Sequence, residues 1–160
     1  MKHYQIYANI DIAAYNELSQ EDCKLIDAAK SATHTSYSPY SRFAVGAALL
    51  LDNGEIVCGS NQENASYPVG CCAERSALFW AGGNRSGHTV RAIAIAANNG
   101  KDFTPHITAP CGMCRQALAE TEHKQGKPIR VLLYSTGGIH ILNSVADLLP
   151  LSFQADTMDI

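Results

Sequence analysis

Apolar and polar residues along the chain follow spacings that indicate both strands and helices. Residues 4–12 carry apolar side chains at every second position, which is a weak signal for a strand. Residues 19–35 carry an apolar stripe with the spacing of one helix face. Ser19 and Asp22 stand at its start in the spacing of a capping box, so we expect the helix to begin there.

The rest of the chain alternates apolar runs with helical patterns. Residues 43–51 and 55–60 flank the turn sequence "DNG", which predicts a β-hairpin. The later segments are bounded by glycine, proline or polar residues: a helix at 72–81 that ends at Gly82-Gly83, a buried strand at 90–97, a helix at 111–124, a second hairpin at 129–142 and a short helix at 143–149. This order predicts an α/β fold, a three-layer α/β/α sandwich around a central mixed five-stranded sheet.

Length and charge narrow the class of protein. A chain of 160 residues suits one domain, so we treat residues 1–160 as a unit in which residues 1–18 are an extension of unassigned role. The formal net charge is −3 and no run of Lys or Arg occurs, which disfavours a nucleic-acid polymer and favours a small molecule as partner. No window approaches the roughly 20 apolar residues of a membrane span, so no membrane association is expected.

Six cysteines bear on the compartment and on the chemistry. The amino-terminal stretch lacks the basic flank and apolar block of an export signal, so we expect a cytoplasmic protein. In a reducing compartment, closely spaced cysteines are more often metal ligands or catalysts than disulfides. Cys111 and Cys114 stand three residues apart at the start of a predicted helix, so both thiols can reach one point. On its own this motif leaves a redox Cys-x-x-Cys pair as the alternative.

A further thiol that completes a metal site is found upstream, in "CCAERSAL". No ligand follows Cys114 at the spacing of a zinc finger. Cys72, like Cys111, stands where a loop becomes a helix, and two facing helix starts would present all three thiols to one ion. Three protein ligands leave the fourth tetrahedral position for water, as in catalytic zinc sites, and Glu74 would lie beside that water. Neighbouring helix residues diverge by about 100°, so Cys71 is expected to be a packing thiol.

The motifs "CAER" and "PCGMCRQ" resemble those of the zinc-dependent cytidine deaminases. The stretches "YSPYSRFAVGAAL", "NQENASYP" and "DLLPLSF" are similar to further segments of the pyrimidine-nucleoside branch of that family, in the same order over residues 20–153. The chain resembles the small, homotetrameric, three-cysteine type. The resemblance implies hydrolysis of cytidine and deoxycytidine to uridine and deoxyuridine, with release of ammonia, in pyrimidine salvage.

The resemblance also implies a role for each residue of the metal site. One Zn²⁺ per chain would be held by Cys72, Cys111 and Cys114. Glu74 would take the proton of the attacking water, pass it to the ring nitrogen and later help the ammonia to leave. Arg75 would hydrogen-bond a thiolate and withdraw negative charge from the site.

Substrate contacts are implied in the same way. Asn61 and Glu63 would hydrogen-bond the ribose, and Phe43 would pack against the pyrimidine ring. The backbone N–H of Ala73 would meet the carbonyl of the base, and the backbone carbonyl of Ala109 would meet its amine.

The carboxyl end carries the last implied contact. Phe153 would reach the base bound in a neighbouring subunit, so that a homotetramer would have shared active sites. Two alternatives stand beside this reading: a deaminase of another aminopyrimidine nucleoside, of the blasticidin-S type, and a structural zinc or redox module without turnover. The ribose motif argues against the first alternative. Against the second stand Glu74 and the lack of a fourth protein ligand at the metal.

Overall fold

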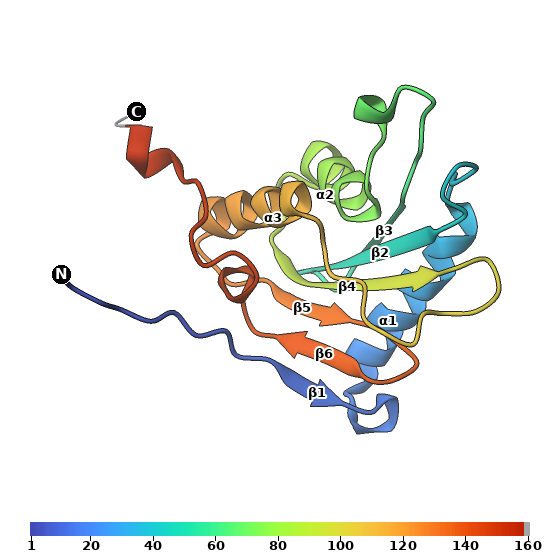
Figure 1. Ribbon diagram of the computed structural model, residues 1–160, viewed down its shortest axis with the longest axis horizontal. Helices are drawn as coiled ribbons and strands as arrows, with labels where there is room; N and C mark the ends of the chain where they lie inside the picture. The colour runs from blue at the N-terminus through green and yellow to red at the C-terminus, as the bar shows by residue number, and fades with distance from the viewer. Residues whose placement is uncertain (159–160) are drawn as a thin grey trace.

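The computed structural model describes residues 1–158, so residues 159–160 of the predicted single domain lie outside the described part. The middle layer of this described part is a six-stranded mixed sheet in the order β1-β6-β5-β4-β2-β3 (Figure 1). β4 and β5 run parallel, and the other neighbouring strands run antiparallel. The strands are β1 Asp11–Ala13, β2 Ala44–Leu51, β3 Ile56–Ser60, β4 Val90–Asn98, β5 Arg130–Leu133 and β6 Ile139–Leu142.

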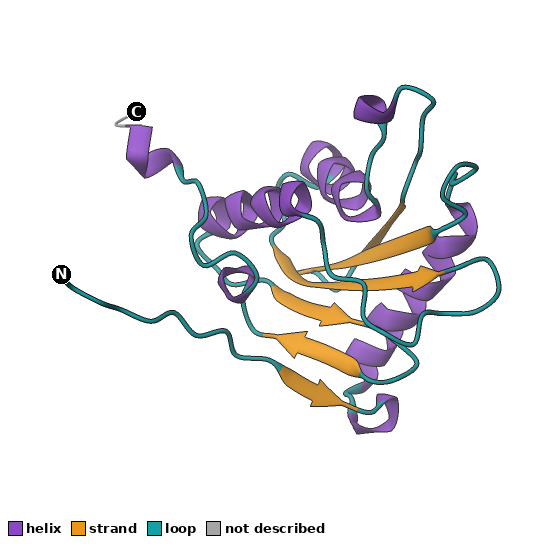
Figure 2. Cartoon of the chain, viewed as in Figure 1, coloured by secondary structure: helices purple, strands orange, loops and turns teal. Residues whose placement is uncertain are grey.

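Helices cover both faces of the sheet: α1 Gln20–Ala32 lies on one face, and α2 Ala73–Asn84 and α3 Gly112–Gln125 lie on the other (Figure 2). Because side chains alternate along a strand, each central strand contributes to two cores. On β2, Leu49 belongs to the core under α2 and α3, whereas Leu50 belongs to the core under α1. The predicted three-layer sandwich is confirmed. Among the described residues, no helix has the length and apolar character needed to cross a membrane.

The sheet has one strand more than the five predicted, because β1 adds to the free edge of β6. Of the alternating residues 4–12, only the end forms a strand, with Ile12 opposite His140. β6 is itself only 4 residues long, so the chain before β1 runs past its end. Residues 1–10 are exposed and extend away from the sheet in Figure 1.

The end of α2 also differs from the expectation. The pattern predicts a stop at Gly82-Gly83, but the helix continues past both glycines. A glycine inside a helix costs about 1 kcal/mol relative to alanine. Arg85, the C-cap residue, offsets this cost, since its backbone N–H bonds to Ala81 O at 2.7 Å and its Nε donates to both carboxylate oxygens of Glu55.

Only one half of the capping box forms at the start of α1. Ser19 Oγ accepts a hydrogen bond from the backbone N–H of Asp22 at 3.1 Å. The Asp22 carboxylate instead pairs with Arg130 of β5, at 3.0 and 3.2 Å, and so ties α1 to the sheet. The short helix expected at 143–149 is a 3-10 turn, Val145–Asp147, capped by Ser144.

Candidate metal centre and active site

Three thiols converge where α2 and α3 begin. Cys72 and Cys111 directly precede the two helices, and Cys114 lies in the first turn of α3. Their sulfur atoms all lie within 4.8 Å of one another, with Cys111 Sγ 3.8 Å from Cys72 Sγ and 3.5 Å from Cys114 Sγ. Zinc bonds thiolates at about 2.3 Å, and the corners of a tetrahedron of that radius lie about 3.8 Å apart. The three sulfurs therefore fit three corners of a zinc site.

The positions of these thiols follow from the ends of the helices. The first turn of a helix has backbone N–H groups without intrahelical partners and a partial positive charge, both of which stabilise thiolates. Cys72 and Cys111 both have the extended backbone of an N-cap residue. Because α2 and α3 lie on the same face of the sheet (Figure 1), thiols from distant parts of the sequence meet at one point.

The thiols shift one another's pKa values through direct contacts. A hydrogen bond from Cys114 lowers the pKa of Cys72 to about 5, and Arg75 contributes in the same direction. The contact with Cys72, together with burial, raises the pKa of Cys114. Cys114 is fully buried, so its proton leaves only for a strong competitor such as a divalent cation.

A guanidinium lies against this cluster. Arg75 Nη2 donates to Cys72 Sγ at 3.7 Å, and the contact raises the pKa of the guanidinium. Among the described residues, Arg75 Nε is buried without a hydrogen-bond partner. Three thiolates on a dication leave one net negative charge, so a fixed cation here offsets that charge.

Glu74 lies in the first turn of α2 and is only 4% exposed. Burial raises the pKa of its carboxyl group, and the negative charge of Cys72 adds to the effect. A carboxyl group with a raised pKa can bind and release a proton closer to neutral pH than an exposed one. Its position two residues after Cys72 suits a group that exchanges protons with a ligand at the metal.

A cavity of about 640 Å³ opens beside the cysteines, within the size range of small-molecule sites. Two of its walls are joined by backbone hydrogen bonds between Gln62 and Cys71, with N–O distances of 2.8 and 2.9 Å. Its lining residues come from three short segments and from the two helices: Tyr40 and Ser41; Asn61 to Asn64; Tyr67, Pro68 and Gly70 to Cys72; Arg75 of α2; and Met113 of α3. The expected ribose-binding stretch and Cys72, one of the three clustered thiols, therefore face one cavity.

Glu63 lines this cavity and also holds the turn that forms its rim. Its Oε2 accepts from the backbone N–H groups of Tyr40 and Ser41 at 2.9 and 3.2 Å, and the Ser41 hydroxyl donates to Oε1. The bond from the Ser41 hydroxyl is the main cause that lowers the pKa of Glu63. The carboxylate is therefore ionised and fixed in place at neutral pH.

Asn61 is held by contacts on both ends of its side-chain amide. Oδ1 accepts from Val45 N at 2.8 Å and from Ser36 Oγ at 2.5 Å, and Nδ2 donates to Phe43 O at 2.9 Å. An amide nitrogen has two hydrogens to donate, so one N–H is left for a ligand in the cavity.

The other expected substrate contacts lie outside the cavity lining. Phe43 is half-buried, and Ala73 is fully buried at the first position of α2. Ala109 is exposed, directly before the loop enters α3. Phe153 is 62% exposed, with its backbone bonded to Gln116 of α3.

Some cavity residues carry no signal strong enough to identify them from the sequence. Tyr40 and Tyr67 form an edge-to-face pair with ring centroids 6.1 Å apart, and Met113, which lines the same cavity, is 65% exposed. Tyr67 stands in the ribose motif and Met113 stands between two ligands, so proximity to motifs is the only available signal. Cys71, expected to be a packing thiol, is half-buried and lines the cavity.

Comparison with known proteins places this site in a family. Residues 19–126 match the family model of the cytidine and deoxycytidylate deaminase zinc-binding region. A cytidine deaminase from Halalkalibacterium halodurans is 42% identical over 137 residues, which cover 84% of this chain and 96% of that protein. The crystal structure of cytidine deaminase from Burkholderia pseudomallei matches with a TM-score of 0.69 and 40% identity, covering 85% of this chain and 100% of that one. A blasticidin-S deaminase from Bacillus cereus is 26% identical over 138 residues, covering 85% of this chain and 94% of that protein. With its three cysteines in the matched zinc-binding region, the chain belongs to the cytidine and deoxycytidylate deaminase family.

Proposed function

We propose that this protein hydrolyses cytidine and deoxycytidine to uridine and deoxyuridine and releases ammonia, as a zinc-dependent enzyme of pyrimidine salvage. The observation that carries the proposal is a three-sulfur cradle with zinc spacing beside a buried Glu74. When bound there, zinc lowers the pKa of water from 15.7 to about 7 and so provides a nucleophile at neutral pH. Three protein ligands leave room for that water.

Glu74 performs the proton transfers in this proposal. Its carboxylate takes a proton from the attacking water and delivers it to the ring nitrogen of the base. It then takes the second proton, from the hydroxyl group that has become bonded to the ring carbon, and transfers it to the amine. The carbon–nitrogen bond breaks, ammonia leaves and the ring carbon becomes the carbonyl of uridine. One carboxyl group serves as base and then as acid, and burial supports this use by raising its pKa.

The neighbouring residues hold the nucleoside. The free N–H of Asn61 and the ionised Glu63 bind the hydroxyl groups of the ribose, and both line the cavity. Phe43 packs on the pyrimidine ring, while the backbone N–H of Ala73 and the backbone carbonyl of Ala109 bind its carbonyl and its amine. Arg75 stabilises the thiolates through its hydrogen bond to Cys72 Sγ.

The proposal is tested by measuring ammonia release from cytidine, deoxycytidine and blasticidin S, before and after treatment with a chelator. Release from the two nucleosides that stops on zinc removal and returns on zinc addition is the expected result. Preference for blasticidin S would favour the other deaminase activity found among the relatives. Zinc binding without any ammonia release would favour a structural module.

Cytidine monophosphate and single-stranded oligonucleotides should be poor substrates. The ionised Glu63 lies in the cavity wall, and a phosphate brought beside it would meet like charge in a partly desolvated site. The ratio of kcat/KM for cytidine monophosphate to that for cytidine measures the effect. Glu63→Gln should raise this ratio, even though it weakens ribose binding. Rapid deamination of an oligonucleotide by the unmodified protein would contradict the assignment to nucleosides.

We further propose a cytoplasmic homotetramer in which Phe153 completes the active site of a neighbouring subunit. The six cysteines are free thiols, which supports a reducing compartment. The Phe153 side chain is 62% exposed near the carboxyl end, where a large apolar residue gains stability only if something covers it.

Phe153→Ala, or truncation after Leu151, should raise the KM for cytidine about fivefold, since an aromatic contact is worth about 1 kcal/mol. Mixing Phe153→Ala subunits with Glu74→Gln subunits should lower the KM again, because the inactive subunits supply the missing ring. Met158→Ala is the matched control, because Met158 is also an exposed apolar residue near the carboxyl end. A fully active monomer on sizing chromatography, or no recovery of KM on mixing, would contradict the shared site.

A further inference from the structure

The residues that follow the last cysteine ligand hold the carboxyl-terminal segment. Arg115 Nη1 donates to Leu148 O at 2.9 Å, and Arg115 Nε donates to Pro110 O at 2.9 Å. Gln116 Nε2 donates to Phe153 O at 2.8 Å, and Gln116 Oε1 accepts from Phe153 N at 3.2 Å. The "CRQ" stretch therefore links the metal-binding helix to the chain near its end.

The contact between Gln116 and Phe153 has the geometry of a strand pair. In an extended backbone, the N–H and C=O of one residue point to the same side, and a partner that bonds both fixes the plane of the peptide groups. The side chain of that residue then stands roughly perpendicular to the plane. One amide group thus restricts the side of the segment from which the exposed Phe153 side chain leaves the backbone.

We propose that Gln116 is a positioning residue for the deamination reaction: it orients Phe153 so that the ring meets the base in a neighbouring active site. The proposal rests on the proposed function and on the shared site, and it adds a residue whose side chain bonds the Phe153 backbone and not the substrate. In this proposal α3, which carries Cys114 and is preceded by Cys111, also positions an aromatic side chain for the neighbouring subunit.

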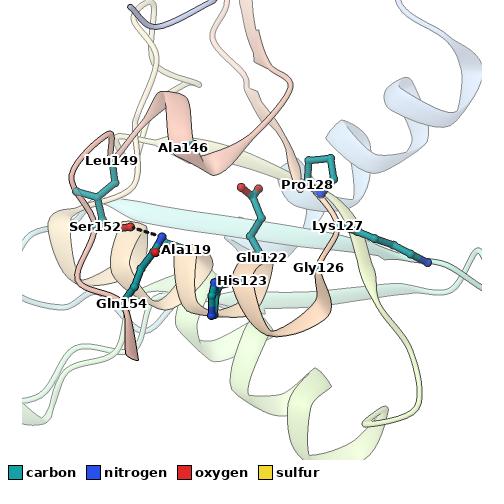
Figure 3. Close-up of a pocket in the computed structure, with 10 residues that line it drawn as sticks. All are labelled: Ala119, Glu122, His123, Gly126, Lys127, Pro128, Ala146, Leu149, Ser152 and Gln154. Atoms are coloured by element: carbon teal, nitrogen blue, oxygen red, sulfur yellow. Dashed lines mark hydrogen bonds between the residues drawn. The ribbon is translucent and has the colours of Figure 1, made fainter. Parts of the chain in front are cut away.

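The surroundings of Phe153 explain why such a residue is needed. Figure 3 shows Leu149, Ser152 and Gln154 next to α3, among the residues that line a hollow. The volume of this hollow is about 370 Å³. The Ser152 hydroxyl accepts from Gln154 at 3.2 Å, within the segment itself, and Leu151 is 75% exposed. Ordering each residue of such an exposed segment costs roughly 1–2 kcal/mol of entropy, and specific contacts must offset that cost.

The chain offers a matched control on the same helix. Gln125 makes the same two-bond contact, with the backbone of Val90: its Oε1 accepts from Val90 N at 3.0 Å, and its Nε2 donates to Val90 O at 2.9 Å. Gln125 is the last residue of α3 and bonds the first residue of β4, whereas Gln116 lies in the second turn of the helix. Gln→Met at either position keeps the length of the side chain and removes both of these hydrogen bonds. At Gln125 it also removes a bond from Nε2 to Lys127 O at 2.9 Å, so this control loses at least as many contacts as Gln116→Met.

Gln116→Met should raise the KM for cytidine about fivefold, which is the loss expected for the misplaced ring, and should leave kcat and zinc content unchanged. Gln125→Met should lower Tm but leave KM unchanged. In a Phe153→Ala background, Gln116→Met should add no further rise in KM, because the two changes act through the same ring.

An additive rise in the double variant, or a normal KM for Gln116→Met in an enzyme that turns over cytidine, would overturn the positioning role alone. Absence of turnover in the unmodified protein would overturn the proposed function together with this role. A KM rise in Gln125→Met equal to that in Gln116→Met would show a general loss of structure and would also overturn it. Gln116→Glu gives a second check, since it keeps the acceptor for Phe153 N–H but places an oxygen against Phe153 O, so its KM should rise at least as much as that of Gln116→Met.

Discussion

Glu74→Gln is expected to lower kcat for cytidine by at least about 10³-fold while zinc content and Tm are retained. The amide has the shape of the carboxyl group but cannot accept the proton of water or deliver it to the base, so both halves of the reaction lose their proton carrier. The side chain is 4% exposed, and a neutral amide is no harder to bury than a carboxyl group whose pKa burial has raised. Steady-state kinetics, metal analysis and thermal unfolding of one preparation check the three parts of the prediction.

A control at the equivalent position of another helix separates proton transfer from helix electrostatics. Glu21 stands in the first turn of α1, as Glu74 does in α2, and pairs with Arg91 at the surface. Glu21→Gln removes a negative charge from a helix N-terminus without touching the cavity, so it should leave kcat unchanged. A near-normal kcat for Glu74→Gln would remove Glu74 from the mechanism, whatever the control does.

Much of the fold could be predicted from local signals. Ser19 begins α1, and α3 ends at Gly126, which has a φ of 64° that suits glycine. The turn "DNG" joins β2 and β3 as expected, with Gly54 at a φ of 85°. These features depend on residues close together in the sequence, so a pattern contains nearly all the information that determines them.

The errors arose where distant residues decide the outcome. The pairing of Ile12 with His140 joins parts of the chain that no local pattern connects, and so the sixth strand was not predicted. The stop predicted at Gly82-Gly83 was wrong because Arg85 bonds Glu55, which lies 30 residues earlier.

The residues of the metal site could be predicted from the sequence more readily than the residues that line the cavity beside it. Cys72 and Cys111 each mark a helix start, and that local feature sufficed to suggest that the two helix starts meet. The residues that line the cavity, such as Tyr40 and Tyr67, meet only through the tertiary fold. The contact of Gln116 with Phe153 spans 37 residues and is visible only in the structure.

Replacing the two adjacent cysteines separately should give opposite results for zinc. Cys72→Ser should raise the zinc Kd by more than about 100-fold, beyond the 10–100-fold typical of losing an outer contact, because it removes one of the three sulfurs in the cradle. Cys71→Ser should retain about one zinc per chain, since the Cys71 thiol donates at 3.6 Å to the backbone oxygen of Cys72 and lies outside the cluster of three sulfurs. Metal analysis of both variants after dialysis against a weak chelator gives the comparison.

The pair is informative because the two substitutions are chemically identical and adjacent. Both exchange a half-buried thiol for a hydroxyl just before α2, so a general disturbance of the helix start would affect zinc equally in both. Only a difference in ligation predicts that one variant loses the ion and the other keeps it. Cys72 also receives the Arg75 hydrogen bond and has its pKa lowered to about 5, which prepares it as a thiolate. Loss of zinc from Cys71→Ser together with retention in Cys72→Ser would show that the chain binds the metal through the other cysteine, and the geometry at the start of α2 would then have to change when the ion binds.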